Sequence, residues 1–448
     1  MKHTILILTL LLLSLSGSAQ WPFAFESTTM SVNPTEFQRD GIIRAWKDDY
    51  VVVSNKDALG DYYIMAYKAN DVVNHTSASS AIVKMLSGFV LNDLQVHGDN
   101  VYFCGSSNNT QGVLGWFDLN DLIGTAPFFG YGIQLPQSMA THLNKLAVYA
   151  GTDGETFIAA LGDTSAYNTK RSDRLFEWSG STQFTDADWC ILTAPTLNVV
   201  SYDDIKATDD FVVIAGRCSE PAPSIAGGLI LRRYKKGNLQ NGLLDDYYFY
   251  PHLACPAEPV KSTHLKSNLL GVAVDFHLQP WQTSIYTIDI VTMGMLNNQD
   301  IPVAAKSRAL DLVYSNALGY LILSLEHAYT PSHQVSGELI FINPLATSPY
   351  TADFLYDASY PRITSLAVAY QRMLYAIDGY RILLREAQYL PSTVTNPCYA
   401  ASNITINPTS IFISKANTAP QTINVLPNNT LHNQLNIDIW NVTLDCAN

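Results

Sequence analysis

The stretch "DLQVHGDNVYFCGS", residues 93–106, contains two short apolar runs separated by the turn Gly98-Asp99-Asn100. Apolar residues that alternate on both sides of such a turn predict a β-hairpin. A third run, "GVLGWFDL" at 112–119, follows after a polar loop and extends the hairpin to three strands. Whether the chain repeats this unit determines its architecture, because repeated sheets bury their apolar faces against one another.

The same succession of run, short polar turn, run, loop and run occurs in six further segments. They begin with "IIRAWKDDYVVVSN" (42–55), "SMATHLNKLAVYAGT" (138–152), "DDIKATDDFVVIAGR" (203–217), "KSTHLKSNLLGVAVDF" (261–276), "LDLVYSNALGYLILSLEH" (310–327) and "SLAVAYQRMLYAID" (365–378). A fourth apolar run often closes the unit, as in "AIVKML" (81–86) and "DYYFY" (246–250). The runs are rich in Val, Ile, Tyr and Phe, which favour β-strands.

Seven such units, at spacings of roughly 46 to 66 residues, fall in the range of propeller blades. Residues 42–388 therefore resemble the seven-bladed β-propeller superfamily. The resemblance concerns the fold alone, because the chain lacks the Gly-His and Trp-Asp pair of Trp-Asp repeats, the paired glycines of kelch repeats and the boxes of sialidases. It implies an all-β fold of four-stranded antiparallel blades around an axis.

The two ends of the repeat region lead to further expectations. The seventh unit lacks an obvious fourth strand, and residues 21–31, "WPFAFESTTMS", either supply it and lock the last blade to the first or form a leader. We expect a propeller domain over 20–388 and a β-rich appendage over 389–448. The appendage has candidate strands in "NITINP", "SIFIS", "TINVLP" and "LNIDIWNVTL". It forms a small β domain, a clasp on the propeller or part of an export signal.

The first residues predict export. Lys2 and His3 precede the apolar run "TILILTLLLLSL", and the small residues Gly17 and Ala19 follow it, so residues 1–19 are predicted to be a signal peptide. The run is shorter than the ~20 residues that span a bilayer, which argues against a membrane anchor. We expect a secreted, periplasmic or cell-surface protein whose mature chain has no transmembrane segment.

Composition limits the partners. Hydrophobic residues make up 47% of the chain and charged residues 15%, which is enough for a large core. The net charge of −13 argues against nucleic acid as a partner. The six cysteines of an exported chain predict disulfides, and none forms a CxxC pair. Among the possible pairings, placement in the fold favours Cys218–Cys255 and Cys398–Cys446, which leaves Cys104 with Cys190.

The connections differ between the two faces of the predicted propeller. The turns between first and second strands are short, and they define a short-turn face. The opposite, long-loop face receives insertions at 106–112, 217–227, 251–259, 275–282, 326–336 and 356–362. Variable loops on a rigid scaffold usually carry the binding residues. The candidate ligand-binding residues on these loops are His252, His277, Trp281, His327, Tyr329, His333, Tyr360 and Arg362. Their alternative role is to cover loop backbone.

The residues that open the first strand of each unit suggest a second site. They are Ile42, Asp93, Ser138, Asp203, Lys261, Asp311 and Ser365. The three aspartates, Asp93, Asp203 and Asp311, fall in alternate units at the mouth of the axial channel, where carboxylates favour Ca²⁺ or another divalent cation. The alternative is that each Asp accepts hydrogen bonds from the backbone of its own turn.

The sequence therefore favours a binding protein over an enzyme. It contains no GxSxG elbow, no HxH or HExxH pair and no phosphate-binding loop, so no catalytic residue is predicted. We expect an exported propeller that binds a glycan, a peptide or an envelope protein through its long loops. The alternative is a polysaccharide lyase or glycoside hydrolase with a metal or histidine site on the same face. A third class is a purely structural role in an assembly.

Overall fold

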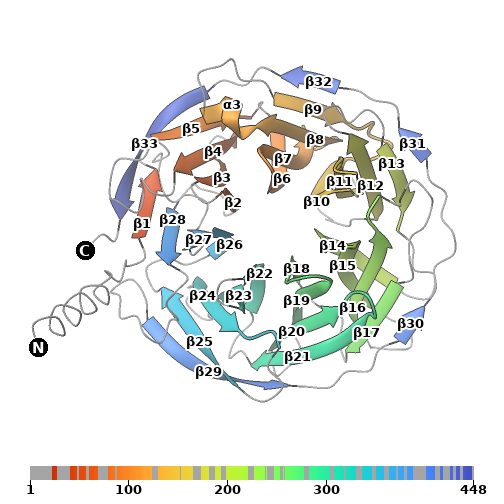
Figure 1. Cartoon of the computed structure of the whole chain (residues 1–448), viewed down its shortest axis with the longest axis vertical. Coiled ribbons are helices and arrows are strands. Elements are labelled where there is room, and N and C mark those ends of the chain that lie inside the picture. Colours follow the sequence, from red (N-terminus) through yellow and green to blue (C-terminus); the bar gives the residue numbers. More distant parts are fainter. Residues whose placement is uncertain are drawn as a thin grey trace, which may run out of the picture.

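A computed structural model gives the structure of the chain. It describes residues 23–27, 41–47, 50–56, 60–68, 79–85, 88–123, 130–151, 153–164, 173–180, 187–192, 198–219, 227–237, 239, 247–252, 256, 258–276, 282–302, 307–316, 319–328, 335–345, 350–357, 363–369, 372–377, 381–386, 400–408, 414–416, 424–426, 430–433 and 437–445. These residues form an all-β propeller of four-stranded antiparallel blades around a central axis (Figure 1). The predicted fold class is thereby confirmed at the level of the propeller.

Six blades consist of four strands that are consecutive in the chain. Blade 1 contains β2 (Ile42–Trp46), β3 (Tyr50–Lys56), β4 (Tyr62–Lys68) and β5 (Ser79–Lys84), and blade 2 contains β6 (Phe89–His97), β7 (Asn100–Ser107), β8 (Gln111–Asp118) and β9 (Gly130–Gln134). Blade 3 contains β10 (His142–Ala150), β11 (Thr156–Asp163), β12 (Arg174–Gly180) and β13 (Ala187–Ile191). Blade 4 contains β14 (Asn198–Ala207), β15 (Phe211–Ser219), β16 (Gly227–Lys235) and β17 (Tyr247–His252). Blade 5 contains β18 (Lys261–His264), β19 (Leu269–Phe276), β20 (Gln282–Asp289) and β21 (Gly294–Pro302), and blade 6 contains β22 (Ser307–Ser315), β23 (Tyr320–Ala328), β24 (Val335–Ile342) and β25 (Tyr350–Asp357).

The predicted count of seven equivalent blades needs correction. Among the described residues, the last unit has three consecutive strands, β26 (Ile363–Ala369), β27 (Arg372–Ile377) and β28 (Arg381–Glu386). Its fourth strand is β1 (Phe23–Ser27), which pairs with β28 and confirms the predicted role of the N-terminal stretch. We call this composite the closing unit. It shares one nine-stranded sheet with blade 1, and β26 packs against β2 to complete the ring.

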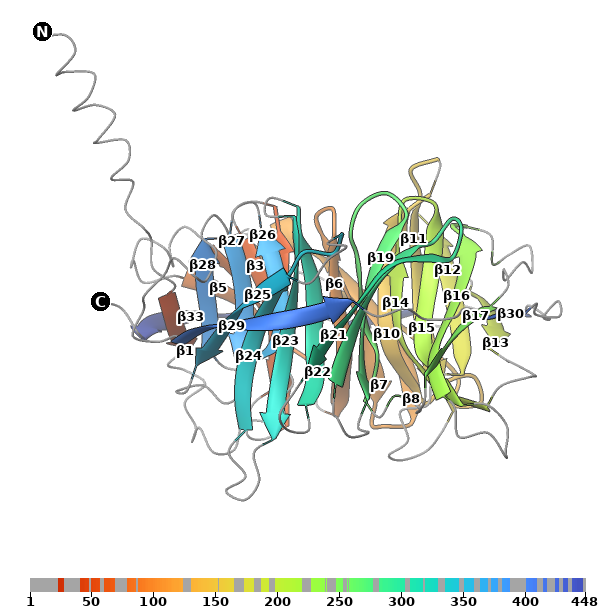
Figure 2. The same cartoon turned by 90° about the horizontal axis from the view of Figure 1, so that it is seen from below.

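The C-terminal strands lie on the outer rim of the propeller, and we call them the belt. They are β29 (Ala400–Pro408), β30 (Ser414–Ala416), β31 (Asn424–Leu426), β32 (Thr430–Asn433) and β33 (Ile437–Asp445). Each adds to the outermost strand of a blade, in an order opposite to that of the blades along the chain: β29 pairs with β25 and β21, β30 with β17, β31 with β13, β32 with β9, and β33 with β5 and β1. Figure 2 shows β29 running across the outside of the neighbouring strands.

The hydrophobic core lies between adjacent blades, because each sheet has apolar residues on both faces. The cluster between blades 1 and 2 includes Val52 and Phe103, and that between blades 4 and 5 includes Leu231 and Val272, all of them buried. The short turn predicted at Gly98 is present between β6 and β7, and Gly98 adopts the positive φ of 59° that such a turn requires. The short helix α3 (Leu119–Ile123) follows β8, with Leu119 and Leu122 buried.

Blade 3 differs from its sequence prediction. The repeat pattern predicts the short polar turn of "SMATHLNKLAVYAGT" (138–152) at Leu143-Asn144-Lys145, but this triplet lies inside the innermost strand β10. The pairing register of β10 shifts between Leu143 and Lys145, which marks a β-bulge. Asn144 donates a hydrogen bond of 2.8 Å to Asp163 there, so a residue typical of turns is used at a bulge. The actual first turn of this blade lies between Ala150 and Thr156.

The described cysteines are buried in the blades. Cys104 and Cys190 are free thiols, so their predicted pairing is wrong. Cys218 is also a buried thiol, with Sγ 3.8 Å from the carbonyl oxygen of Gly228. Cys255, Cys398 and Cys446 lie outside the described residues. Within the described segments, no helix has the length and apolar character needed to cross a membrane.

Candidate functional site

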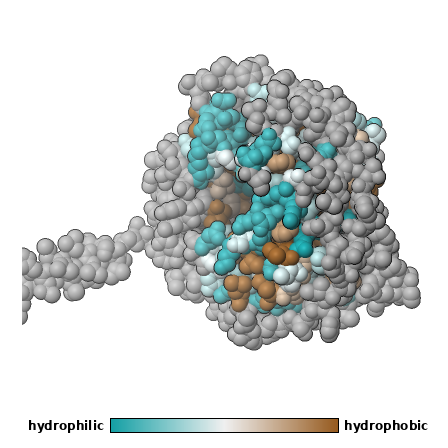
Figure 3. All heavy atoms as spheres, turned by 45° about the vertical axis from the view of Figure 1, so that its right-hand side comes forward, coloured by the Kyte–Doolittle hydropathy of each residue, from teal (hydrophilic) through white to brown (hydrophobic). Residues whose placement is uncertain are grey.

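A polar cavity of about 340 Å³ lies at the centre of the ring. It is bounded by the N-terminal parts of the innermost strands β2, β6, β18, β22 and β26, together with residues of β10 and β14. Because the links from the preceding blades arrive at these strand starts, this part of the cavity borders the long-loop face. Described residues coloured as hydrophilic border the hollow near the middle of the molecule (Figure 3).

A β-bulge precedes many of the cavity residues. The pairing registers shift just before Asp93 in β6, Lys145 in β10, Asp204 in β14, Asp311 in β22 and Ser365 in β26. A bulge adds one residue to one strand and changes the face on which the next side chain lies. The bulges therefore set which residue of each innermost strand faces the axis.

The three carboxylates of the cavity connect neighbouring blades. In each, one oxygen accepts the N–H of the following residue, and the other accepts an N–H from the innermost strand of the next unit. These bonds measure 3.0 Å (Leu94) and 3.1 Å (Leu146) for Asp93, 2.9 Å (Ile205) and 2.8 Å (Ser262) for Asp204, and 2.9 Å (Leu312) and 2.8 Å (Leu366) for Asp311. The predicted alternative is an Asp that accepts backbone N–H groups of its own turn, whereas Asp93 and Asp311 accept them within their own strand and from the innermost strand of the next unit.

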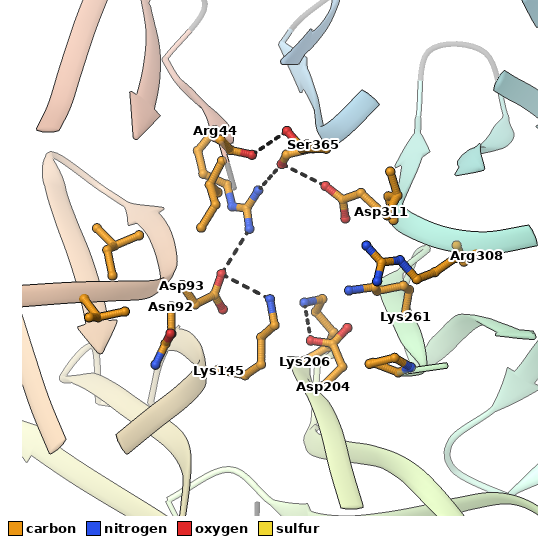
Figure 4. A pocket seen from close by; sticks show the side chains of 18 of the residues that line it. Arg44, Asn92, Asp93, Lys145, Asp204, Lys206, Lys261, Arg308, Asp311 and Ser365 are labelled. Atoms are coloured by element: carbon orange, nitrogen blue, oxygen red, sulfur yellow. Dashed lines mark hydrogen bonds and ion pairs between the residues drawn. The ribbon is translucent and has the colours of Figure 1, made fainter. Parts of the chain in front are cut away.

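Cationic side chains lie between these carboxylates (Figure 4). Arg44 contacts Asp93 at 3.3 Å and donates to the hydroxyl of Ser365 at 3.2 Å. The ammonium group of Lys145 is 3.7 Å from the same Asp93 carboxylate. Lys206 pairs with Asp204 at 2.9 Å. Burial disfavours ionisation of Asp204, but the positive charges of Lys206 and Lys145 outweigh it and lower the pKa of this carboxyl.

Two further cations complete the lining. Arg308 forms ion pairs with Glu258 at 3.9 Å and Glu326 at 3.3 Å. Lys261, the first residue of β18, points into the space between Lys206 and Arg308 in Figure 4. Burial, followed by repulsion from Lys145, lowers the pKa of Lys261 to about 8. Among the described residues, no hydrogen bond or ion pair is found for its ammonium group.

The predicted metal-binding residues do not come together. Asp93 and Asp311 line the cavity, whereas Asp203 lies outside it and pairs with Arg217 at 2.8 Å. The neighbouring Asp204 occupies the position expected of Asp203, because the bulge between Tyr202 and Asp204 shifts the register. No group of three or more His, Cys, Asp or Glu side chains suited to a metal ion occurs among the described residues. Binding of Ca²⁺ or another divalent cation stays a prediction.

Most predicted loop residues lie outside the described part of the chain: His277, Trp281, Tyr329, His333, Tyr360 and Arg362. His327 is described only as part of the backbone of β23. His252 ends β17, and its ring stacks on Phe276 with 3.7 Å between ring centroids. Burial lowers the pKa of His252, which favours the neutral form of its ring. Ligand binding by this set stays a prediction.

Comparison with known proteins identifies no family for this chain. No family model and no curated protein matches the chain. Among solved structures, it is similar to Raptor from Chaetomium thermophilum, at 10% identity and a TM-score of 0.42 over 82% of this chain and 30% of that one. It is also similar to the polysaccharide lyase Uly1, at 9% identity and a TM-score of 0.40 over 78% of this chain and 90% of that one. Its similarity to BamB from Moraxella catarrhalis has 11% identity and a TM-score of 0.37 over 79% of this chain and 98% of that one. The chain thus spans less than a third of the length of that Raptor. These similarities are too low to transfer an activity.

Proposed function

We propose that this protein is an exported binding protein that holds a polar ligand in the axial cavity on its long-loop face. The observation that carries the proposal is the cavity itself, in which charged side chains from different blades point toward one space (Figure 4). A volume of about 340 Å³ lies within the range of small-molecule sites. The ligand would be a glycan or peptide that places one polar group in the cavity, with the long loops contacting the rest.

An enzyme of the glycoside hydrolase or polysaccharide lyase class is the alternative. Glycoside hydrolysis needs two carboxyl groups that are available for proton transfer and attack. At this cavity Asp93, Asp204 and Asp311 each accept two backbone hydrogen bonds, which favours binding over hydrolysis. Release of shortened saccharides during the binding assay would favour the enzyme.

A panel of soluble glycans and peptides tests the proposal, with saturable binding followed by calorimetry. Thr364→Trp places a large ring in the lining of the cavity and should weaken binding at least 10-fold. Thr292→Trp, at an exposed turn between β20 and β21, is the matched control and should bind like the wild type. Hydrogen exchange should independently show ligand protection at the starts of β6 and β22. An affinity that Thr364→Trp does not change, together with protection from hydrogen exchange only in strands far from the cavity, would contradict the proposal.

A further inference from the structure

Cationic side chains outnumber carboxylates in the lining of the cavity. Its lining has five cationic side chains (Arg44, Lys145, Lys206, Lys261 and Arg308) and three carboxylates (Asp93, Asp204 and Asp311). Glu258 and Glu326 balance Arg308 from outside the lining. The cavity is thus rich in hydrogen-bond donors, although the whole chain has a net charge of −13.

The carboxylates have little capacity left for another donor. Asp204 accepts from Ile205, from both the N–H and the hydroxyl of Ser262, and from Lys206, at 2.8 to 2.9 Å. Asp311 accepts two backbone N–H groups and the hydroxyl of Ser365, the last at 2.9 Å. A carboxylate offers about four lone-pair directions, so these groups are close to saturation.

Lys261 therefore faces a cavity that lacks a free acceptor for it. The charged groups around it come from several strands: Lys145 from β10, Asp203, Asp204 and Lys206 from β14, and Arg308 and Asp311 from β22. Repulsion by Lys145, added to burial, holds the pKa of Lys261 near 8. An ammonium group in this position is stabilised by any anion that enters the cavity.

We infer that the cavity binds an anionic group, a carboxylate, sulfate or phosphate, and that Lys261 is its principal anchor. The inference rests on the proposed function and names the class of ligand for that site. An anion supplies the acceptor that the ammonium group of Lys261 lacks, and it adds one for Lys145, whose Asp93 partner is shared with Arg44. A neutral hydroxyl leaves the charge of Lys261 uncompensated. Because the interaction is between charges in a partly solvated cavity, the affinity should fall as salt is added.

Matched ligands test the inference. Glucuronate and glucose differ in one carboxylate, and inorganic sulfate and phosphate probe the other anions. We expect glucuronate to bind the wild-type protein at least 10-fold more tightly than glucose. Lys261→Met should weaken glucuronate binding about 10-fold or more, whereas Lys261→Arg should stay within about 3-fold of the wild type. Lys266→Met, at an exposed turn on the short-turn face, is the control of equal charge change.

The dependence on pH separates an anchor from a merely structural lysine. Lys261 loses its charge as the pH rises through about 8, so wild-type affinity for glucuronate should fall up to 10-fold per pH unit above that value. With Lys261→Arg the affinity should be constant between pH 7 and 9.

The outcomes distinguish the inference from the proposed function. Preference for sulfate or phosphate over glucuronate, lost in Lys261→Met, supports the inference and identifies the anion. Equal binding of glucose and glucuronate in the cavity would overturn the inference and leave the proposed function intact. Anion binding that Lys261→Met does not change would also overturn it. Absence of binding for every probe, together with a negative glycan and peptide panel, would overturn both.

Discussion

At the scale of single residues, the sequence identifies five of the innermost-strand residues that line the cavity and misses Lys145 and Asp204. The alignment of strand starts selects Ile42, Asp93, Lys261, Asp311 and Ser365, and all of these line the cavity. It also selects Asp203, where the structure places Asp204 one residue further on, and Ser138, where it places Lys145 seven residues further on because the predicted turn lies inside β10. A bulge moves the facing residue by one position, and two adjacent aspartates or an Asn-Lys pair give no sign of which one faces inward.

Glu177 is a second buried charged group, distant from the cavity. It lies on β12, accepts a hydrogen bond from the hydroxyl of Tyr149, and accepts the N–H of Leu239 at 3.2 Å. Burial raises the pKa of Glu177 to about 7, with a further contribution from the charge of Asp188. Folding therefore favours the protonated acid. The stability that this gives is complete below the unfolded value of 4.5 and is lost as the pH rises through about 7.

We expect Glu177→Gln to flatten this dependence. Measured by denaturant unfolding, the stability of the wild type should fall by about 2–3 kcal/mol relative to that of the variant between pH 5 and pH 8, because Gln cannot ionise. Its absolute stability at pH 5 should be slightly lower, since the amide nitrogen cannot accept the N–H of Leu239. Parallel stability curves for the two proteins over this pH range would contradict the assignment.

At the scale of elements, the cavity carboxylates couple one innermost strand to the next. Asp204 joins β14 to β18, and Asp311 joins β22 to β26. The sequence predicts the alternation of aspartates because these residues recur in every second unit. It does not predict their partners, because the backbone N–H groups belong to strands that are more than 50 residues away.

Asp204→Asn tests this coupling. One oxygen becomes an amide nitrogen that cannot accept the N–H groups now bound, and Lys206 loses its ion pair. We expect a loss of about 2–3 kcal/mol in the free energy of unfolding at pH 7. Asp209→Asn, at an exposed turn of the same blade, should change it by less than about 0.5 kcal/mol. Equal effects of the two substitutions would argue against the coupling.

At the scale of the whole molecule, the belt covers outer edges that would otherwise carry unpaired backbone groups. The sequence locates apolar segments in this region, and β29 and β33 fall within or around two of them. It does not reveal that each pairs with a different blade, because such short segments have no pattern that specifies a partner.

We expect Ile439→Pro in β33 to open the belt at blade 1. Ile439 pairs with Ala81 of β5, and proline removes a backbone donor from the strand. Hydrogen exchange of residues 79–84 should speed up at least 10-fold, and the melting temperature should fall by several degrees. Ile439→Val keeps the backbone donor and serves as the control. Unchanged exchange in β5 would contradict the pairing of β33 with blade 1.

The position of β1 between β28 and β33 has a consequence for biosynthesis. A ribosome makes β1 first, yet both of its neighbours emerge near the end of translation. The backbone N–H and C=O groups of β1 must stay without strand partners while the blades are synthesised. The ring can close only when the nearly complete polypeptide has left the ribosome. A nascent chain arrested before residue 381 would lack the strand that receives β1.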